Sequence, residues 1–308
     1  MRGSTALLIG NFDGLHLGHR ELVRVARGQV GPTGRVVALV FEPHPAVALR
    51  PDAVPPRLCT AAGRRGLLQQ AGVDDVVEMA PSPERLGQSP EEFIEWVVDL
   101  FAPSFIVEGP DFRFWRNREG TIDRLRALGL TSGFSVAVVE PVTVDLPGAD
   151  GVEVHSGRIR QQLLDGRVED AALMLGRPWS LHGEVVQGDQ RGRELDMPTA
   201  NLDHGTAMLP RDGIYAGTAV LPDGRMCMGA ISVGVKPTFE EVPRVCEVHL
   251  LDYDGPLDDY GWPLEVRFER WLREQVAYDS VEELLHQLDL DIRQVRQWLG
   301  DGESTSST

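Results

Sequence analysis

The hydrophobic pattern changes character part-way along the chain, and this change constrains the fold more than any single residue does. Up to about residue 175, apolar runs such as TALLIG (5–10) and RVVALVF (35–41) alternate with segments of helical period. Downstream of Gly176-Arg177-Pro178 the segments are short, alternate apolar with polar residues, and are separated by Gly, Pro and Asp. The first pattern predicts βαβ units on a parallel sheet, and the second predicts an antiparallel barrel or sandwich.

The two patterns translate into a specific set of elements. In the first part we expect strands at 5–10, 35–41, 75–79, 105–108 and 135–140, and helices at 19–27, 61–71, 90–100, 121–128, 156–164 and 168–175. In the second part we expect strands at 182–187, 213–220, 226–233, 245–251 and 264–270, and a helix at 281–299. We therefore predict an α/β Rossmann-like domain over 1–177, a small antiparallel β-barrel with a C-terminal helix over 178–299, and a disordered polar tail over 300–308.

Composition narrows the class of protein. A chain of 308 residues is long enough for two domains, each with its own core. The formal net charge of -17 argues against a nucleic-acid-coating surface but leaves room for small phosphate-bearing ligands. No apolar run is long enough to span a bilayer, and the N-terminal apolar run reads as a buried strand and not as a signal peptide. Three cysteines (Cys59, Cys227 and Cys246) without a CxxC pair indicate a reducing, cytoplasmic compartment.

A ten-residue run, GNFDGLHLGH, follows the first predicted strand. The strand ends at Gly10, while Gly14 and Gly18 permit tight backbone, and His16 and His19 stand at the entry of a helix. Backbone N–H groups and imidazoles at a helix start can stabilise negative charge on phosphates. Other interpretations are ordinary turn glycines, surface histidines, or a zinc pair, although no third ligand lies at metal spacing.

A second glycine-rich run, GEVVQGDQRGRELDMPTAN, occupies residues 183–201. Gly188 and Gly192 would lend free backbone amides to phosphates. Thr199 and Asn201 offer a hydroxyl and an amide oxygen, which are suitable ligands for Mg²⁺. The alternative is a hairpin turn with a serine/threonine-type turn after it.

Together these runs resemble the bacterial bifunctional riboflavin kinase/FMN adenylyltransferases, also called FAD synthetases, over about residues 5–299. The segments that carry the resemblance are GNFDGLHLGH, FEPHP (41–45), EGPDFRF (108–114), VHSGRIR (154–160), PTAN (198–201) and EVHLLDYDG (247–255). The resemblance implies an enzyme that uses ATP and Mg²⁺ to phosphorylate riboflavin to FMN and to adenylylate FMN to FAD. Its partners would be these small molecules, with neither nucleic acid nor a membrane involved.

The resemblance also implies residue roles. In the first domain His16 and His19 would contact ATP phosphates, and Ser156 and Arg160 would hold the triphosphate from the other side. The loop that binds the nucleotide would be shaped by Gly10, Phe12, Asp13, Gly14 and Gly18. From the residues alone, Arg160 could equally be a surface arginine of a helix.

In the second domain the resemblance makes Glu247 the general base for the ribityl 5′-hydroxyl. It places Arg273 near the flavin end, and it makes Thr199 and Asn201 ligands of Mg²⁺ beside the phosphate loop of Gly188 and Gly192. From the residues alone, Glu247 could instead be an exposed carboxylate on a strand, and Arg273 could be one half of a surface ion pair.

Two rival functions stand beside this interpretation, and departures from the family pattern motivate the first of them. Trp115 stands where the family usually has Gly, and His155-Ser156-Gly157 replaces a serine- and threonine-rich start. Trp115 could stack on the purine, narrow the site or point to solvent. One rival is a riboflavin kinase whose first domain is inactive or altered in nucleotide or flavin-analogue specificity. The other is a non-catalytic regulator that binds flavin or nucleotide.

Overall fold

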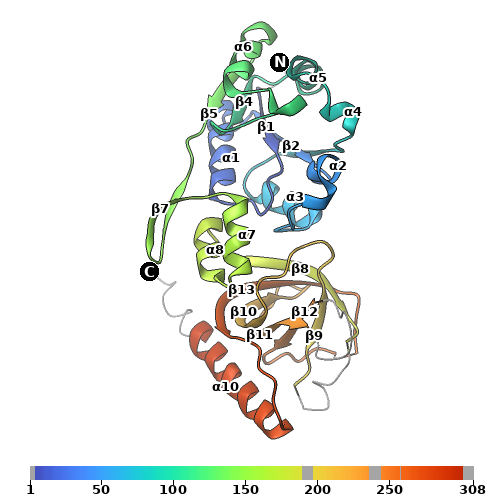
Figure 1. Cartoon of the computed structure of the whole chain (residues 1–308), viewed down its shortest axis with the longest axis vertical. Coiled ribbons are helices and arrows are strands. Elements are labelled where there is room, and N and C mark those ends of the chain that lie inside the picture. Colours follow the sequence, from blue (N-terminus) through green and yellow to red (C-terminus); the bar gives the residue numbers. More distant parts are fainter. Residues whose placement is uncertain (1–3, 189–196, 236–243, 257, 301–308) are drawn as a thin grey trace. The chain divides into compact units, whose positions relative to one another are not determined.

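The computed structural model of the protein describes residues 4–188, 197–235, 244–256 and 258–300. The chain forms two compact units, Met1–Pro56 with Ala61–His155, and Arg57–Thr60 with Ser156–Thr308 (Figure 1). Residues 156–177 therefore group with the second unit, and the functional boundary between residues 177 and 178 stays a prediction. Gly192 and residues 301–308 of the predicted tail lie outside the described residues, whereas Gly300 ends the last helix.

The first unit is built on a parallel sheet. Its strands are β1 (Thr5–Gly10), β2 (Arg35–Phe41), β3 (Asp75–Met79), β4 (Phe105–Glu108) and β5 (Ser135–Val138), with a hairpin of β6 (Thr143–Leu146) and β7 (Ala149–Glu153). Its helices are α1 (Leu17–Val30), α2 (Ala46–Leu49), α3 (Ala61–Gln70), α4 (Pro83–Leu86), α5 (Pro90–Phe101) and α6 (Ile122–Ser132), with the 3-10 turns η1 (Pro51–Ala53) and η2 (Arg116–Arg118). The five strands are arranged in the order β3-β2-β1-β4-β5. The chain adds strands to one side of β1 and then, from β4 onward, to the other side, and open α/β sheets bind ligands at such a switch point.

Both faces of this sheet are buried, as the continuous apolar runs of its strands predict. Along β1, Ala6 and Leu8 pack in one cluster with Val23 of α1 and residues of α3. Leu7 and Ile9 point to the opposite face and pack in a second cluster with residues of α5 and α6. The period of two along a strand divides its side chains between these helical layers.

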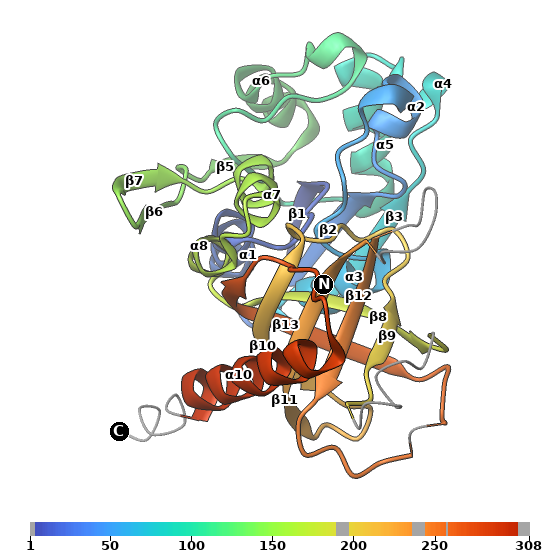
Figure 2. The same ribbon diagram turned by 60° about the horizontal axis from the view of Figure 1, so that its bottom comes forward.

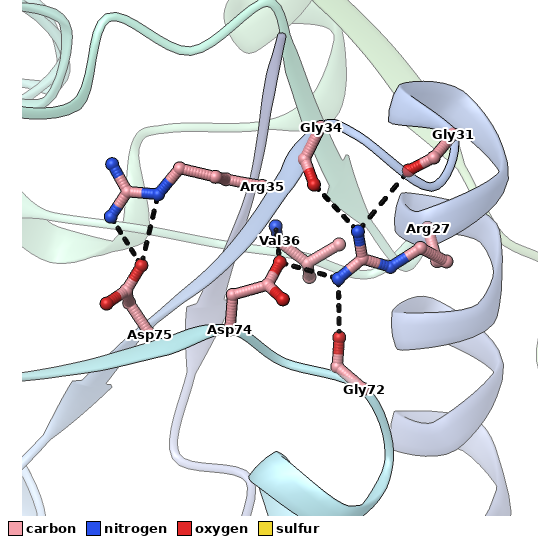
Figure 3. Close-up of polar contacts among 8 residues, drawn as sticks. All are labelled: Arg27, Gly31, Gly34, Arg35, Val36, Gly72, Asp74 and Asp75. Carbon is pink, nitrogen blue, oxygen red and sulfur yellow. Dashed lines mark hydrogen bonds and ion pairs between the residues drawn. The ribbon is translucent and has the colours of Figure 1, made fainter. Parts of the chain in front are cut away.

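Arg27 secures the end of the sheet at which its strands begin. Its guanidinium donates to the carbonyls of Gly31, Gly34 and Gly72 and to Asp74 Oδ2 at 2.5 Å, as Figure 3 shows. Asp74 Oδ2 also accepts the N–H of Val36 at 2.7 Å. One side chain thus joins the end of α1 to the starts of β2 and β3.

The second unit is a closed antiparallel barrel with helices. Its strands are β8 (Trp179–Val186), β9 (Ala200–Asp203), β10 (Gly213–Val220), β11 (Met226–Val235), β12 (Arg244–Leu250) and β13 (Pro263–Arg273). Its helices are α7 (Ser156–Leu164), α8 (Val168–Leu175) and α10 (Val281–Gly300). The barrel order is β10-β11-β12-β9-β8-β13. The buried Phe268 ring packs edge to face against Tyr215 and at a tilt of 45° against Trp179. Helix α10 packs along β10 and β11 (Figure 2).

The prediction of an α/β domain and an antiparallel barrel with a C-terminal helix is confirmed. Three strands were not predicted: the exposed hairpin β6–β7, which extends away from the sheet in Figure 2, and β9. Residues 200–203 form a strand because they pair with β12 on one side and β8 on the other. Strand β5 ends at Val138, two residues earlier than expected, and β13 runs on to Arg273.

Among the described residues, no helix has both the length and the apolar character needed to cross a membrane.

Candidate active sites

The loop after β1 is buried and conformationally constrained. Phe12 and Leu15 are each 2% exposed and have φ angles of 48° and 40°, and Gly14 between them has a φ of 76°. Positive φ angles in residues other than glycine cost energy and cluster at functional sites. A Cβ at Gly18 would lie 3.2 Å from the His16 ring, so only a glycine leaves this ring undisturbed. The loop is therefore held in one shape before any ligand arrives.

The two histidines of this loop stack at the start of α1. His16 is the N-cap of the helix, and its Nδ1 accepts the backbone N–H of His19 at 3.3 Å. The two rings lie 3.6 Å apart at 20°, and the His19 ring meets Phe12 edge to face. Burial, helped by the neighbouring His16, holds the pKa of His19 well below its usual value. His19 is therefore neutral at pH 7 and can donate a hydrogen bond from one ring nitrogen.

The described residues contain no group of three or more His, Cys, Asp and Glu side chains that could hold a metal ion. The zinc interpretation of His16 and His19 therefore gains no support from the structure.

A buried carboxyl, which the sequence analysis did not single out, lies where β1 and β4 diverge. Glu108 is 3% exposed, and its Oε1 accepts the N–H of Ile9 at 2.7 Å. The two strands pair only from Ala6 to Leu7, so the Glu108 side chain replaces a main-chain acceptor further along β1. Burial, together with the charge of Asp111, raises the pKa of Glu108 well above its usual value, although the Ile9 hydrogen bond opposes this.

Trp115 is packed in the core of the first unit, so the suggestion that it points to solvent is wrong. It is 7% exposed and stacks on Phe93 with an angle of 15° between the rings. Its backbone has φ 55° and ψ -161°, a conformation suited to glycine. Its indole Nε1 is buried and has no hydrogen-bond partner among the described residues. Phe93 covers one face of the ring and leaves that face unavailable to a purine.

Ser156 and Arg160 lie on α7, within the second unit, and both are half-buried. Four residues apart on a helix, they share one face. Their role opposite the histidine loop stays a prediction.

Two of the predicted kinase residues meet on the outer surface of the barrel. Asn201 of β9 and Glu247 of β12 are directly paired, and Glu247 is also paired with Ser232 of β11. Paired residues on antiparallel strands share a face. The neighbours of Glu247 in sequence, Cys246 and Val248, are fully buried inside the barrel, so Glu247 faces outward.

This outer face borders a cavity of about 850 Å³ between the barrel and α10. Its lining includes Thr199, Glu247 and Arg273 together with apolar residues of α10. A smaller cavity on the other side of Thr199 is lined by Asn201 and by the stacked rings of Tyr253 and Trp262. Thr199 thus borders two cavities, a large apolar one that contains a carboxylate and a smaller aromatic one.

Arg273 is fixed in this cavity by a buried ion pair. Its Nε and Nη2 donate to the two carboxylate oxygens of Asp291 at 2.9 and 2.6 Å. Asp291 is 1% exposed and also accepts from Gln287 at 2.9 Å. The Asp291 hydrogen bond raises the pKa of Arg273 further above its usual value. Arg273 therefore belongs to a buried bidentate pair and not to a surface ion pair.

Gly188 and Asn201 approach closely at the mouth of the smaller cavity. A Cβ at position 188 would overlap the Asn201 carboxamide. A larger residue at position 188 would therefore displace the Asn201 side chain from its present position. Gly192, the other glycine of the predicted phosphate loop, lies outside the described residues.

Family comparisons agree with this division of sites. The FAD synthetase family model matches residues 2–148, and the riboflavin kinase model matches residues 175–299. The bifunctional riboflavin kinase/FMN adenylyltransferase of Escherichia coli (strain K12) is 31% identical over 96% of this chain and 92% of its own. The chain belongs to this family. It is accordingly a transferase of flavin cofactor biosynthesis.

Other members of the bifunctional family match at a similar level. The Pseudomonas fluorescens riboflavin kinase/FMN adenylyltransferase is 33% identical over 96% of this chain and 93% of its own. Among solved structures, one described as a macrolide-efflux protein from Streptococcus pneumoniae is 29% identical, with a TM-score of 0.85 over 97% of this chain and 95% of its own. The likeness to each extends over nearly the whole chain.

Proposed function

We propose that this protein phosphorylates riboflavin to FMN in its second unit and joins FMN to the AMP part of ATP in its first unit. The observation that carries the proposal is the outer face of the barrel, where Glu247 and Thr199 border one cavity and Thr199 and Asn201 border another. A carboxylate in a large apolar cavity suits an alcohol acceptor on a flat aromatic substrate.

For the kinase, Glu247 is proposed as the general base. It would take the proton of the ribityl 5′-hydroxyl as that oxygen bonds to the γ-phosphorus of ATP and the bond to the β-phosphate oxygen breaks, releasing ADP. Positioning and neutralisation of charge dominate such a step, since the protein forms no covalent bond. The backbone amides around Gly188, and those at Gly192, would hold phosphate oxygens. Arg273, fixed by Asp291, would line the flavin end of the large cavity.

Thr199 and Asn201 fit a bound Mg²⁺, which is also part of the proposal. Both offer uncharged hard oxygens, the ligand type that Mg²⁺ prefers beside the phosphates of its substrate. The contact of His249 Nδ1 with the Pro198 carbonyl, at 2.8 Å, anchors the segment just before Thr199. The ion would neutralise charge that develops on the transferred phosphoryl group.

For the adenylyltransferase, the His16–His19 loop is proposed as the triphosphate site. An oxygen of the FMN phosphate would attack the α-phosphorus of ATP and release pyrophosphate, so no protein base is required. Charge would build on the departing pyrophosphate, where the ring N–H groups of the two histidines and the N-terminus of α1 would stabilise it. Ser156 and Arg160 would hold the same triphosphate from α7.

The roles of the remaining loop residues follow from their shape. Gly10, Gly14 and Gly18 would keep the backbone close to the phosphates, while Phe12 and Asp13 would hold the loop in its buried conformation. We also propose a cytoplasmic location, supported by three cysteines, Cys59, Cys227 and Cys246, that form no CxxC pair.

A product assay tests the whole proposal. The protein is incubated with riboflavin, ATP and Mg²⁺, and the flavins are separated by chromatography. FMN followed by FAD is expected. FMN alone would favour a kinase whose first unit is inactive or altered, and unchanged riboflavin would favour a regulator that binds flavin without catalysis. Omission of Mg²⁺ in the presence of a chelator is expected to stop both products.

A further inference from the structure

A buried arginine of α3 lies beneath the carboxyl ends of β1 and β2. Arg64 is 5% exposed, and its Nη1 donates to two main-chain carbonyls, those of Asn11 at 3.2 Å and Phe41 at 3.1 Å. Its Nη2 pairs with Glu42 Oε2 at 2.8 Å. Asn11 is the first residue after β1, Phe41 is the last of β2, and Glu42 follows directly. A single guanidinium therefore joins the two segments that leave neighbouring strands at this edge.

The three hydrogen bonds of Arg64 fix the positions of the two segments relative to each other, in addition to neutralising the charge of Glu42. A guanidinium is planar, and its donors leave it in fixed directions. One nitrogen that serves two carbonyls from different strands sets the separation of those carbonyls. The ion pair with Glu42 balances the buried charge, and little of the Arg64 side chain reaches solvent. Arg64 is thus placed to act on the loops and not on a ligand directly.

A second link joins the same two segments. His44 Nδ1 accepts the N–H of Ala46 at 3.0 Å, so in the neutral ring the hydrogen is on Nε2. This Nε2 lies 3.2 Å from the carboxamide of Asn11, whose oxygen is buried and has no other partner among the residues that the structure describes. Because carboxamide oxygen and nitrogen exchange places by rotation, the His44 N–H can donate to that oxygen. Asn11 is consequently held by Arg64 through its main chain and by His44 through its side chain.

We propose that Arg64 is a positioning residue of the adenylyl-transfer site. It holds the start of the loop that carries His16 at a fixed distance from the segment after β2, so that ATP meets a preorganised set of donors. This inference rests on the adenylyltransferase function proposed above. Preorganised geometry accounts for large rate factors, and a misplacement of about 1 Å can cost roughly 10²-fold in rate.

The neighbouring arginine provides a matched control. Arg65 lies on the same helix, but it donates to the Val76 carbonyl and to Glu78, both on β3 and away from the loops. Arg64→Met and Arg65→Met remove the same charge from adjacent positions. Arg64→Lys restores the positive charge but lacks the planar guanidinium with its fixed donor directions. Riboflavin phosphorylation by each variant serves as an internal measure of the amount of active protein.

The experiment measures kcat and KM for FAD formation from supplied FMN and ATP, with folding checked by circular dichroism at the assay temperature. We expect Arg64→Met to lower kcat by about 10- to 100-fold with KM for ATP changed less than about threefold, since loops are misplaced while ligand groups remain. Arg64→Lys should recover only part of this loss. Arg65→Met should match the parent, and all three variants should keep the parental rate of FMN formation.

Different results would overturn the inference. A folded Arg64→Met with the parental kcat for FAD formation refutes it, as does Arg64→Lys with full parental kcat, because the planar guanidinium would then be unnecessary. If Arg64→Met does not fold, the Arg64→Lys kcat decides by the same criterion. A parent that makes FMN but no FAD would instead refute the proposed adenylyltransferase function on which the inference depends.

Discussion

Replacement of Trp115 separates the contribution of its ring from the strain in its backbone. Truncating a buried aromatic ring to alanine costs about 3–5 kcal/mol of folding free energy. The loss is partly offset because the buried indole N–H, which has no partner among the described residues, disappears as well, a gain of about 1–3 kcal/mol. We therefore expect Trp115→Ala to destabilise the first unit by roughly 2–3 kcal/mol.

Trp115→Gly should be less damaging than Trp115→Ala, which reverses the usual order. The backbone at this position has φ 55° and ψ -161°, where a Cβ costs about 1–3 kcal/mol and glycine costs nothing. Glycine loses about 0.5–1 kcal/mol through the greater freedom of its unfolded chain. The net preference for glycine is about 1 kcal/mol. Trp96, in the middle of α5, is the control. At that helical position the alanine variant should be more stable than the glycine variant by about 1 kcal/mol.

Hydrogen exchange of peptides from α5 and β4 in increasing urea reports the stability of the first unit alone. The reasoning is refuted if Trp115→Ala is as stable as Trp115→Gly while the Trp96 pair shows the ordinary order. Because Phe93 covers one face of the Trp115 ring, we also expect KM for ATP in FAD formation to change by less than about threefold in Trp115→Gly. A large rise in KM would show that the ring supports the nucleotide after all.

Four further outcomes are expected. Glu247→Ala should lower FMN formation by about 10²–10⁴-fold while supplied FMN is still converted to FAD, and a near-normal kinase rate would remove Glu247 from its role as base. His19→Ala should lower FAD formation by about 10²-fold or more with the kinase rate unchanged, and equal FAD output would exclude it as a phosphate donor. Asp291→Ala should cost the barrel about 3 kcal/mol in urea unfolding, near the lower end for a broken buried pair because Arg273 keeps some solvent contact. Burial raises the folded pKa of Glu108, so its contribution to stability is complete below the unfolded pKa of about 4 and is lost as pH rises through the folded pKa. Glu108→Gln should flatten this decline in the free energy of urea unfolding, whereas parallel curves for the parent and the variant would contradict the assigned burial effect.

The element types of this protein could be predicted from the sequence because they depend on local patterns. Continuous apolar runs bounded by helical segments indicated a parallel sheet covered on both faces, and β1 indeed divides its side chains between two helical layers. The glycines and histidines after β1, and the PTAN segment, are chemically specific within a few residues. Their presence therefore indicated phosphate chemistry, and their resemblance to a known family indicated flavin substrates, before any contact was known.

The partners of those residues were decided only by the tertiary structure. Residues 200–203 become a strand because barrel closure supplies neighbours on both sides, which a run of four residues does not indicate. The acceptors of Arg64 lie 53 and 23 residues away in sequence, and Glu108 meets the N–H of Ile9 across 99 residues. Periodicity reports which face of an element is buried, but it carries no information on which distant groups a buried charge will meet. These long-range contacts follow from the order of the strands and from the crossover connections between them. The contacts of Arg64 and Glu108 in the first unit therefore became evident only in the folded chain.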